Sequence, residues 1–374
     1  MKLKKLLATG LALCMAGSML AGCGSGSGTT TAAATTAAPA GTTAEATTAA
    51  DGTTAAGTTA AASAGETDFP TKNVSGIIQW GAGGGTDNLM RPLATLAEKE
   101  LGKSIVVENK AGATGTIATQ YVYDKDADGY TLLMGAENPQ LYTALDLLNL
   151  TYADFEPVFL IGDETVGIVV SKDSPYKSFT ELINAALEKP GELTISTTGK
   201  GGLPWEVGSF ITAVTGATFN QVPYDSDAAA KTAVIGGECD FTVCKIQSGI
   251  EDYKAGTLNF LCMFSKEPAP AMPEVPLITA EYPDFEQYMP WGPFYGVFVK
   301  KGTDQAIIDK LGEAFKKAYE DPAYQEQLAN TNVNALGLTG SEAKEYMKNW
   351  QLNTINALNK SGAIDKTAAD LGLE

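Results

Sequence analysis

The sequence predicts an α/β fold with two domains, and two observations carry this prediction. After Thr67, short apolar runs alternate with amphipathic helical patterns, which is typical of strands joined by crossover helices. The stretch from Thr67 to Glu374 is also long enough for two domains of about 150 residues each. Because crossover helices join strands that run in the same direction, we expect parallel sheets.

An apolar run at 74–80 predicts the first strand, and the leucine spacing before Gly102 predicts the helix that follows it. Pro92 falls inside this helical pattern, so we expect the helix to begin near Arg91 or to be irregular in its first turn. The first segment is completed by strands at 104–108 and 130–134 and a helix at 115–123.

The rest of the chain repeats the alternation. Ser178 and Glu181 have the spacing of a capping box at the start of one helix. The predicted strands are 166–171, 193–196, 218–222, 239–243, 258–264 and 296–300, and the predicted helices are 178–187, 204–215, 227–235, 304–319 and 341–358.

The N-terminus has the order of a secretion signal. Three lysines precede an apolar run that ends at Leu20, and this run is shorter than the ~20 residues that a spanning helix needs. The sequence Leu-Ala-Gly-Cys at 20–23 resembles the lipobox of bacterial lipoproteins, whose cysteine is acylated after cleavage. We expect residues 1–22 to be a signal peptide and Cys23 a lipid anchor. An ordinary signal with an incidental cysteine is the alternative.

The segment after Cys23 consists almost entirely of Thr, Ala, Gly and Ser up to residue 66. It has too little apolar surface to offset the loss of chain entropy on folding. Residues 23–66 are therefore predicted to be the lipid-anchored cysteine followed by a disordered linker.

Composition excludes several classes of function. The net charge of −18 makes nucleic acid a poor partner. The chain has no histidine, which removes Ser-His-Asp and Cys-His catalysis and the common histidine zinc sites. We expect no metal and no cofactor.

Three cysteines remain once Cys14 leaves with the signal and Cys23 is acylated. An odd number argues against a complete disulfide framework, so we expect Cys239, Cys244 and Cys262 to be buried thiols. One bridge to Cys262 is the alternative. Cys239 and Cys244 are expected on opposite sides of one strand.

Two glycine-rich loops follow predicted strands, at 81–87 and 109–115. Glycines let backbone amides approach a ligand, and a helix N-terminus carries partial positive charge, so an anion is the expected guest. Loops at adjacent strand ends face the same crevice. A tight turn capped by Thr86 or Asp87 is the simpler alternative. A dinucleotide fingerprint is disfavoured because Thr86 replaces its third glycine.

Five stretches together resemble the extracytoplasmic solute receptors of tripartite tricarboxylate transporters, the TctC or Bug family. The resemblance covers residues 69–374. It is carried by Gly83-Gly84-Gly85-Thr86-Asp87 with Arg91, by Val106–Lys110 with Gly112, Ala113 and Gly115, by Asp128–Leu133, by Val222–Tyr224, and by Gly236 and Gly237 with Asp240.

This resemblance implies a two-lobed periplasmic-binding-protein-like fold of type II, the Venus flytrap, with a ligand cleft between two α/β domains. Residues 67–169 and 290–374 would form a discontinuous first domain, and residues 170–289 the second. Crossing strands are expected near 166–172 and 296–300.

The resemblance also implies a site that holds a ligand carboxylate mainly through main-chain amides. Where the family commonly has a histidine this chain has Trp205, and Asp225 and Ser226 replace a basic residue and a glycine. Lys200 could supply a positive charge or be an exposed loop lysine, and Arg91 could form a surface or interdomain ion pair. The expected ligand-binding residues are Trp80, Gly84, Gly85, Thr86, Asp87, Ala113, Thr114, Ser196, Thr198, Gly199, Tyr224 and Asp225.

The function implied is that of a solute-binding lipoprotein, not an enzyme. It would sit outside the cell membrane on the lipid of Cys23, on the periplasmic side in a Gram-negative cell. As a monomer it would capture a small organic acid, a di- or tricarboxylate or a related compound, for integral-membrane transporter subunits. A receptor feeding a sensor is one alternative. An exported enzyme using carboxyl groups such as Glu137 or Asp240 is another.

Overall fold

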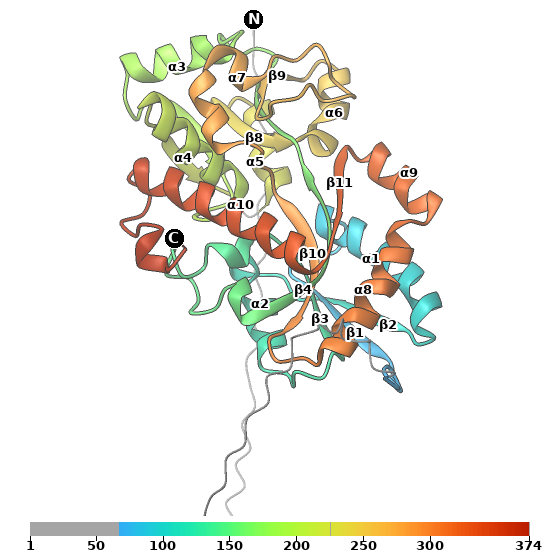
Figure 1. The fold of residues 1–374 in the computed structure, drawn as a ribbon. Helices are drawn as coiled ribbons and strands as arrows, with labels where there is room; N and C mark the ends of the chain where they lie inside the picture. The colour runs from blue at the N-terminus through green and yellow to red at the C-terminus, as the bar shows by residue number, and fades with distance from the viewer. Residues whose placement is uncertain (1–66, 225, 374) are drawn as a thin grey trace, which may run out of the picture. The chain divides into compact units, whose positions relative to one another are not determined.

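The structure, a computed structural model, describes residues 67–224 and 226–373, which belong to the compact unit Ala62–Glu374. The predicted signal peptide, Cys23, the predicted linker and Asp225 lie outside the described residues. Helices surround two separate sheets (Figure 1). The α/β prediction is confirmed.

The first sheet has six strands in the order β11-β4-β10-β3-β1-β2. β1 pairs in parallel with β2 and β3, whereas β10 runs antiparallel to β3 and β4, and β11 antiparallel to β4. The strand bounds are β1 Val74–Ile78, β2 Ile105–Asn109, β3 Thr131–Ala136, β4 Phe155–Glu164, β10 Phe294–Lys300 and β11 Val333–Leu338.

The second sheet has five strands in the order β7-β6-β8-β5-β9. β6 is parallel to β7 and β8, and β5 is antiparallel to both β8 and β9. The bounds are β5 Val166–Ser171, β6 Thr194–Thr197, β7 Asn220–Pro223, β8 Phe241–Lys245 and β9 Leu258–Met263.

The expectation of parallel sheets is therefore wrong for β10 and β11 in the first sheet and for β5 in the second. β5 follows β4 after the single residue Thr165 and enters the second sheet without a crossover helix, so its direction is not set by one. The chain passes between the sheets at Thr165, directly before β5, and through residues 264–293, directly before β10, next to the two segments where crossing strands were expected. Neither β5 nor β10 is itself shared between the sheets.

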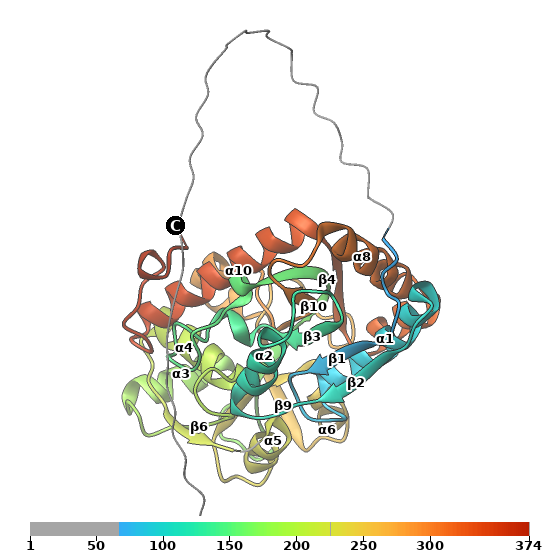
Figure 2. The same cartoon turned by 90° about the horizontal axis from the view of Figure 1, so that it is seen from below.

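Helices cover both faces of the first sheet (Figure 2). α1 (Gly85–Leu101) and α8 (Gln305–Tyr319) pack with Ile78 and Met134 on one face. The neighbouring residues Ile77 and Leu133 point to the other face, towards α2 (Thr116–Tyr123), because successive strand residues alternate.

The second sheet is covered in the same way. α3 (Phe179–Glu188) and α4 (Leu203–Thr215) contribute to one core cluster, and α5 (Asp227–Ile235) and α6 (Ile246–Lys254) pack towards another. The long α10 (Gly340–Lys360) packs on β4 of the first sheet and on α4, which covers the second sheet, so one helix contacts both halves of the unit.

Helix α1 begins at Gly85, so the predicted start near Arg91 is wrong. Pro92 lies in its interior and cannot donate to the carbonyl oxygen of Asn88 four residues before it. Gln327 Nε2, from α9 (Pro322–Asn330), donates to that oxygen at 2.7 Å instead. A side chain from a distant helix thus fills the acceptor that the proline leaves.

Other local predictions are partly corrected. Ser178 caps α3 by accepting from the Glu181 N–H, but the Glu181 carboxylate accepts from the N–H of Lys177 and not from that of Ser178. Five strands and α-helices were not predicted: β4, α6, α7 (Ile278–Glu281), α9 and β11.

The three described cysteines are free and buried, as predicted. Cys239 precedes β8, which begins at Phe241, so the expectation that Cys239 and Cys244 share one strand is wrong.

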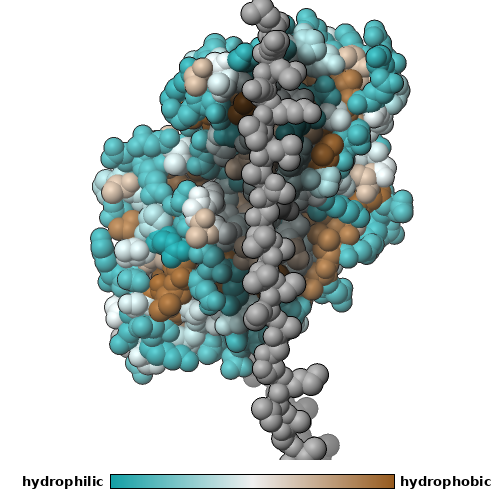
Figure 3. Space-filling view, turned by 180° about the vertical axis from the view of Figure 1, so that it is seen from behind, coloured by the Kyte–Doolittle hydropathy of each residue, from teal (hydrophilic) through white to brown (hydrophobic). Residues whose placement is uncertain are grey.

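The surface of the described residues is mostly hydrophilic on the face shown in Figure 3, with hydrophobic residues in small separate groups. Val106 and Ile117 are more than half exposed. No helix in residues 67–224 and 226–373 combines the length and the apolar composition needed to cross a bilayer.

Candidate ligand-binding site

The two predicted glycine loops lie side by side at one end of the first sheet. One loop joins β1 to α1 and the other joins β2 to α2. Because β1 and β2 are parallel neighbours, their carboxyl ends lie at the same sheet edge. The loop that joins β6 to α4, residues 198–202, occupies the equivalent place in the second sheet.

The helices that follow these three loops have no side-chain cap. Their N-cap residues are Gly84 for α1, Gly115 for α2 and Gly202 for α4, and none makes a side-chain capping bond. By contrast, the hydroxyls of Ser178 and Ser226 cap α3 and α5. Backbone N–H groups in the first turn of an uncapped helix are free to bind an acceptor, so the three loops present donors to an anion.

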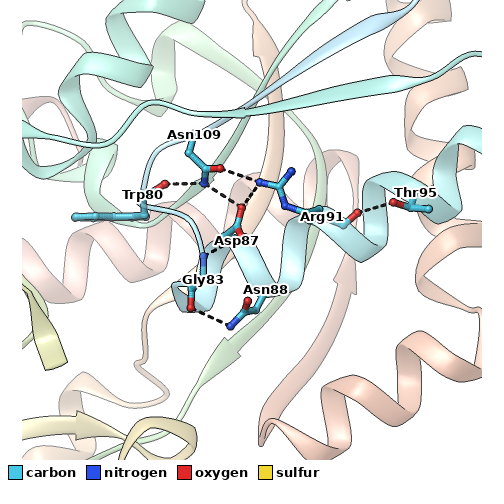
Figure 4. Close-up of polar contacts among 7 residues, drawn as sticks. All are labelled: Trp80, Gly83, Asp87, Asn88, Arg91, Thr95 and Asn109. Carbon is cyan, nitrogen blue, oxygen red and sulfur yellow. Dashed lines mark hydrogen bonds and ion pairs between the residues drawn. The ribbon is translucent and has the colours of Figure 1, made fainter.

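Asp87 holds the first loop in shape (Figure 4). Its carboxylate accepts from the N–H of Gly83 at 3.0 Å, from Asn109 Nδ2 at 2.9 Å and from the Arg91 guanidinium. Burial raises the pKa of Asp87, but the hydrogen bonds from Arg91, Gly83 and Asn109 outweigh it and hold the pKa below its usual value. The Asp87 carboxylate and Arg91 are thus occupied with each other and with the loop.

Two more residues of the first loop differ in exposure. Trp80 is half-buried against the core of the first sheet, and its carbonyl oxygen accepts from Asn109 Nδ2 at 2.9 Å. Thr86 is buried in the first turn of α1. Of the predicted loop residues, Gly84 is the most open to solvent, and Gly85 is half-buried.

The second loop has an unusual backbone. Ala113 and Thr114 have φ values of 47° and 54°, a region that non-glycine residues rarely adopt. Tyr142 stabilises this conformation by donating its hydroxyl to the Thr114 carbonyl oxygen at 2.8 Å. Strain of this kind is often found where backbone meets a ligand.

The predicted site residues of the second sheet differ in their burial and in their contacts. Thr198 and Gly199 lie in the half-buried loop before α4. Ser196 is fully buried and donates its hydroxyl to the Ala230 carbonyl oxygen at 2.8 Å. The Tyr224 hydroxyl lies 3.5 Å from Glu238 and from Cys239, so these contacts hold it against its own sheet.

Residues of the two sheets touch around these loops. Asn138, just after β3, donates its Nδ2 to the Gly201 carbonyl oxygen at 3.2 Å, and Lys200 Nζ lies 3.4 Å from the carbonyl oxygen of Leu145. A Cβ placed on Gly85 would lie 3.7 Å from Lys245 Nζ. The loops of the first sheet therefore face groups of the second.

Lys245 is a site residue that sequence reasoning missed. It ends β8, and its Nζ donates to Tyr295 Oη at 2.8 Å and lies 3.4 Å from Glu164 Oε2. Burial lowers the pKa of Lys245, but the charges of Tyr295 and Glu164 raise it more, so the pKa stands well above its usual value. A single lysine ending an apolar strand was the available sequence signal.

Three buried side chains carry oxygens without a hydrogen-bond partner among the described residues. They are Glu137 Oε2, Asn138 Oδ1 and both carboxylate oxygens of Glu206. Burial raises the pKa of Glu137 to about 7, with Lys245 opposing the shift. Burial and the charge of Glu137 raise the pKa of Glu206 well above its usual value. From the sequence, Glu137 was predicted only as an acid or base of the alternative exported enzyme.

Two cavities lie near these residues. A cavity of about 230 Å³ is lined by Leu203 of α4, Asp227 of α5 and Lys245, and so lies where β8 ends and three helices begin. A larger one, about 520 Å³, lies between α4, β6, β7 and residues 361–363. Neither cavity is lined by a residue of the first two glycine loops. The smaller one includes Lys245, and the larger one includes Gly199 and Lys200 of the loop before α4.

Comparison with known proteins gives a consistent assignment. The family model described as tripartite tricarboxylate transporter family receptor matches residues 89–368. The chain is 27% identical to Protein BugT of Bordetella pertussis over 300 residues, which covers 79% of this chain and 91% of BugT.

Solved structures share the fold. The periplasmic binding protein BugD is 25% identical with a TM-score of 0.70, and the alignment covers 79% of this chain and 99% of BugD. The Rpa4515 protein of R. palustris with adipate is 23% identical with a TM-score of 0.71, covering 79% of this chain and 99% of that protein.

Proposed function

This chain belongs to the family of tripartite tricarboxylate transporter receptors, and we propose that it captures a small carboxylate-bearing metabolite outside the cell for an integral-membrane transporter. The resemblance found in the sequence is thereby confirmed. The adipate bound to its fold neighbour is a dicarboxylate, which supports a ligand of this class.

The observation that carries the proposal is the set of uncapped helix N-termini. Gly84, Gly115 and Gly202 begin helices whose first-turn amides have no side-chain acceptor. Main-chain N–H groups at helix N-termini bind carboxylates without a charged side chain. We propose that the amides of residues 85–87 and of Ala113 and Thr114 hold one ligand carboxylate, with Gly84 shaping the turn through its N–H bond to the Gly81 carbonyl oxygen.

The second sheet closes over the ligand in this proposal. Thr198 and Gly199 contribute from the loop before α4, and Lys245, whose charge is paired with Glu164, lies beside Gly85. Contacts made only when both lobes meet, such as Asn138 with Gly201, favour the closed form, which the transporter would recognise. No covalent step is needed, so the protein acts as a receptor and not as an enzyme.

The remaining parts of the proposal rest on the sequence. A signal peptide at 1–22, a lipid on Cys23 and a linker to residue 66 would place the receptor outside the membrane as a tethered monomer. A discontinuous first domain, 67–169 with 290–374, and a second domain, 170–289, remain the proposed division. Lipid labelling of the wild type and of Cys23→Ser tests the anchor, because only the wild type should incorporate fatty acid.

Ligand binding is tested by thermal shift and calorimetry on the mature chain with a panel of mono-, di- and tricarboxylates. A ligand at 100 times its Kd should add about 2.7 kcal/mol to the free energy of unfolding. Uncharged amides of the same acids serve as controls and should give no shift. Equal shifts with the acids and their amides would contradict carboxylate recognition.

A further inference from the structure

We infer that the site recognises a protonated amine together with the carboxylate, through Glu137, Asn138 and Glu206. This inference rests on the proposed function and narrows its ligand to an amino acid or a related zwitterion. It begins from the four buried side-chain oxygens that have no donor among the described residues.

All four atoms can accept hydrogen bonds when the two carboxyl groups are ionised. Glu206 is fully buried, Glu137 is 4% exposed and Asn138 is 3% exposed. A buried carboxylate without a donor costs free energy, so native proteins satisfy such groups with a partner, a water or a ligand. A ligand that fits three acceptor side chains must bring N–H donors, and an ammonium brings three of them with a positive charge.

The three side chains come together from the two sheets. Glu137 and Asn138 follow β3 of the first sheet, and Glu206 lies in the first turns of α4 on the second. Asn138 Nδ2 donates to the carbonyl oxygen of Gly201, in the loop that leads into α4. Asn138 thus uses its donor to join the lobes and leaves its acceptor Oδ1 unused.

The same groups lie beside the proposed carboxylate site. Lys245 and Glu164 act electrostatically on Glu137, and Lys245 approaches Gly85 at the N-terminus of α1. Lys245 does not itself neutralise Glu137, because it bonds Tyr295 and pairs with Glu164. The donors in the first turn of α1 and the acceptor oxygens of Glu137 therefore both lie near Lys245, and a zwitterion needs a donor group and an acceptor group placed close together.

A metal ion is the other guest that an acidic pair could take. Among the described residues, no group of three or more Cys, Asp or Glu side chains is placed to hold one. Asn138 also supplies a neutral amide oxygen, and an ammonium can donate an N–H to it as well as to a carboxylate oxygen.

The test compares acids that differ only by an amino group, using the mature chain and calorimetry. The pairs are aspartate with succinate, glutamate with glutarate, and alanine with propionate. We expect the best amino acid to bind at least ten-fold more tightly than its partner without nitrogen. Equal or tighter binding of the partner would overturn the inference while leaving the carboxylate receptor in place. If no acid of either kind bound, the proposed function would fail as well.

Variants separate recognition from a structural role. Glu206→Gln and Glu137→Gln should each reduce the ratio of affinities within a pair towards one, with little change for the acid without nitrogen. Glu251→Gln, at an exposed position in α6, is the matched control and should keep the wild-type ratio. An unchanged ratio in both site variants would show that the pair is structural and would overturn the inference.

Proton release gives a second readout. The ammonium stabilises ionised Glu137 and Glu206, so binding at pH 6.5 should release protons, which calorimetry in buffers of different ionisation enthalpy measures. Glu206→Gln should reduce that release. Amino-acid binding with no proton release in the wild type would also overturn the inference.

Discussion

Lys245 Nζ donates to Tyr295 Oη at 2.8 Å, and this bond joins the end of β8 in the second sheet to β10 in the first. Glu164 contacts both residues. Its carboxylate forms an ion pair with Lys245 and accepts hydrogen bonds from the Tyr295 hydroxyl and from Gln247 Nε2. The charge of one lobe is therefore neutralised by a carboxylate of the other, next to the proposed ligand carboxylate.

Replacing Lys245 with methionine should lower the free energy of unfolding by about 3 kcal/mol, because it leaves the buried Glu164 carboxylate without its cation. Urea unfolding measures this change. Lys172→Met, which breaks an exposed pair with Asp173, is the control and should cost less than about 1 kcal/mol. The double variant Lys245→Met with Glu164→Gln should recover part of the loss. Equal effects for Lys245→Met and Lys172→Met would contradict a buried pair.

The Gly85→Val substitution should abolish the ligand-induced thermal shift and leave the fold intact. A Cβ on Gly85 would already lie 3.3 Å from Gln247 Nε2 and 3.5 Å from Tyr295 Oη, so a valine side chain would hold the lobes apart. Gly236→Val, at the end of α5 where a Cβ makes ordinary contacts, is the control. A full shift in Gly85→Val would exclude this loop from the site.

Stability without ligand should fall as pH rises from about 4.5 through about 7. The pKa of Glu137 is raised by burial from 4.5 to about 7, so in this range the folded chain binds more protons than the unfolded chain. The free energy of unfolding then decreases with pH. The Glu137→Gln substitution should flatten this part of the profile. Its gain in the free energy of unfolding relative to the wild type should be largest above pH 7. Urea unfolding between pH 4 and 9 measures the free energy of unfolding of both proteins. If it changed with pH in parallel in the wild type and the variant, the role of Glu137 would be contradicted.

Gln327→Ala should cost about 1 kcal/mol, since it removes the donor that fills the Asn88 carbonyl oxygen. In a Pro92→Ala background the restored helical N–H can serve that oxygen, so the same substitution should cost less. A double-mutant cycle measured by thermal unfolding gives the coupling, and additive effects would show that Pro92 and Gln327 are independent.

Cys244 and Cys262 should react slowly with a thiol reagent in the folded protein. Burial raises the pKa of Cys244 to about 12 and that of Cys262 well above its usual value, so little thiolate exists at pH 8. In a chain of residues 24–374 that carries Cys239→Ser, both thiols should react only after unfolding in denaturant. Rapid reaction of the folded chain would contradict their burial.

The sequence alone determined the α/β class and the loops that carry the proposed function. Alternation of apolar runs with helical patterns is a local property, so most strands and helices could be placed within a few residues. The glycine loops were also visible, because close backbone approach needs particular residues at particular positions. Their order along the chain carried the family resemblance.

Only the tertiary structure decided how these parts meet. The Asn88 carbonyl oxygen left without a donor by Pro92 is filled by Gln327, more than two hundred residues away, and the antiparallel course of β5 follows a direct passage at Thr165. The meeting of Glu137 with Glu206, and of Lys245 with Glu164, joins residues from different sheets. Charge and hydrogen bonding act through space over a few ångströms, and separation along the chain does not reveal which groups will share that space.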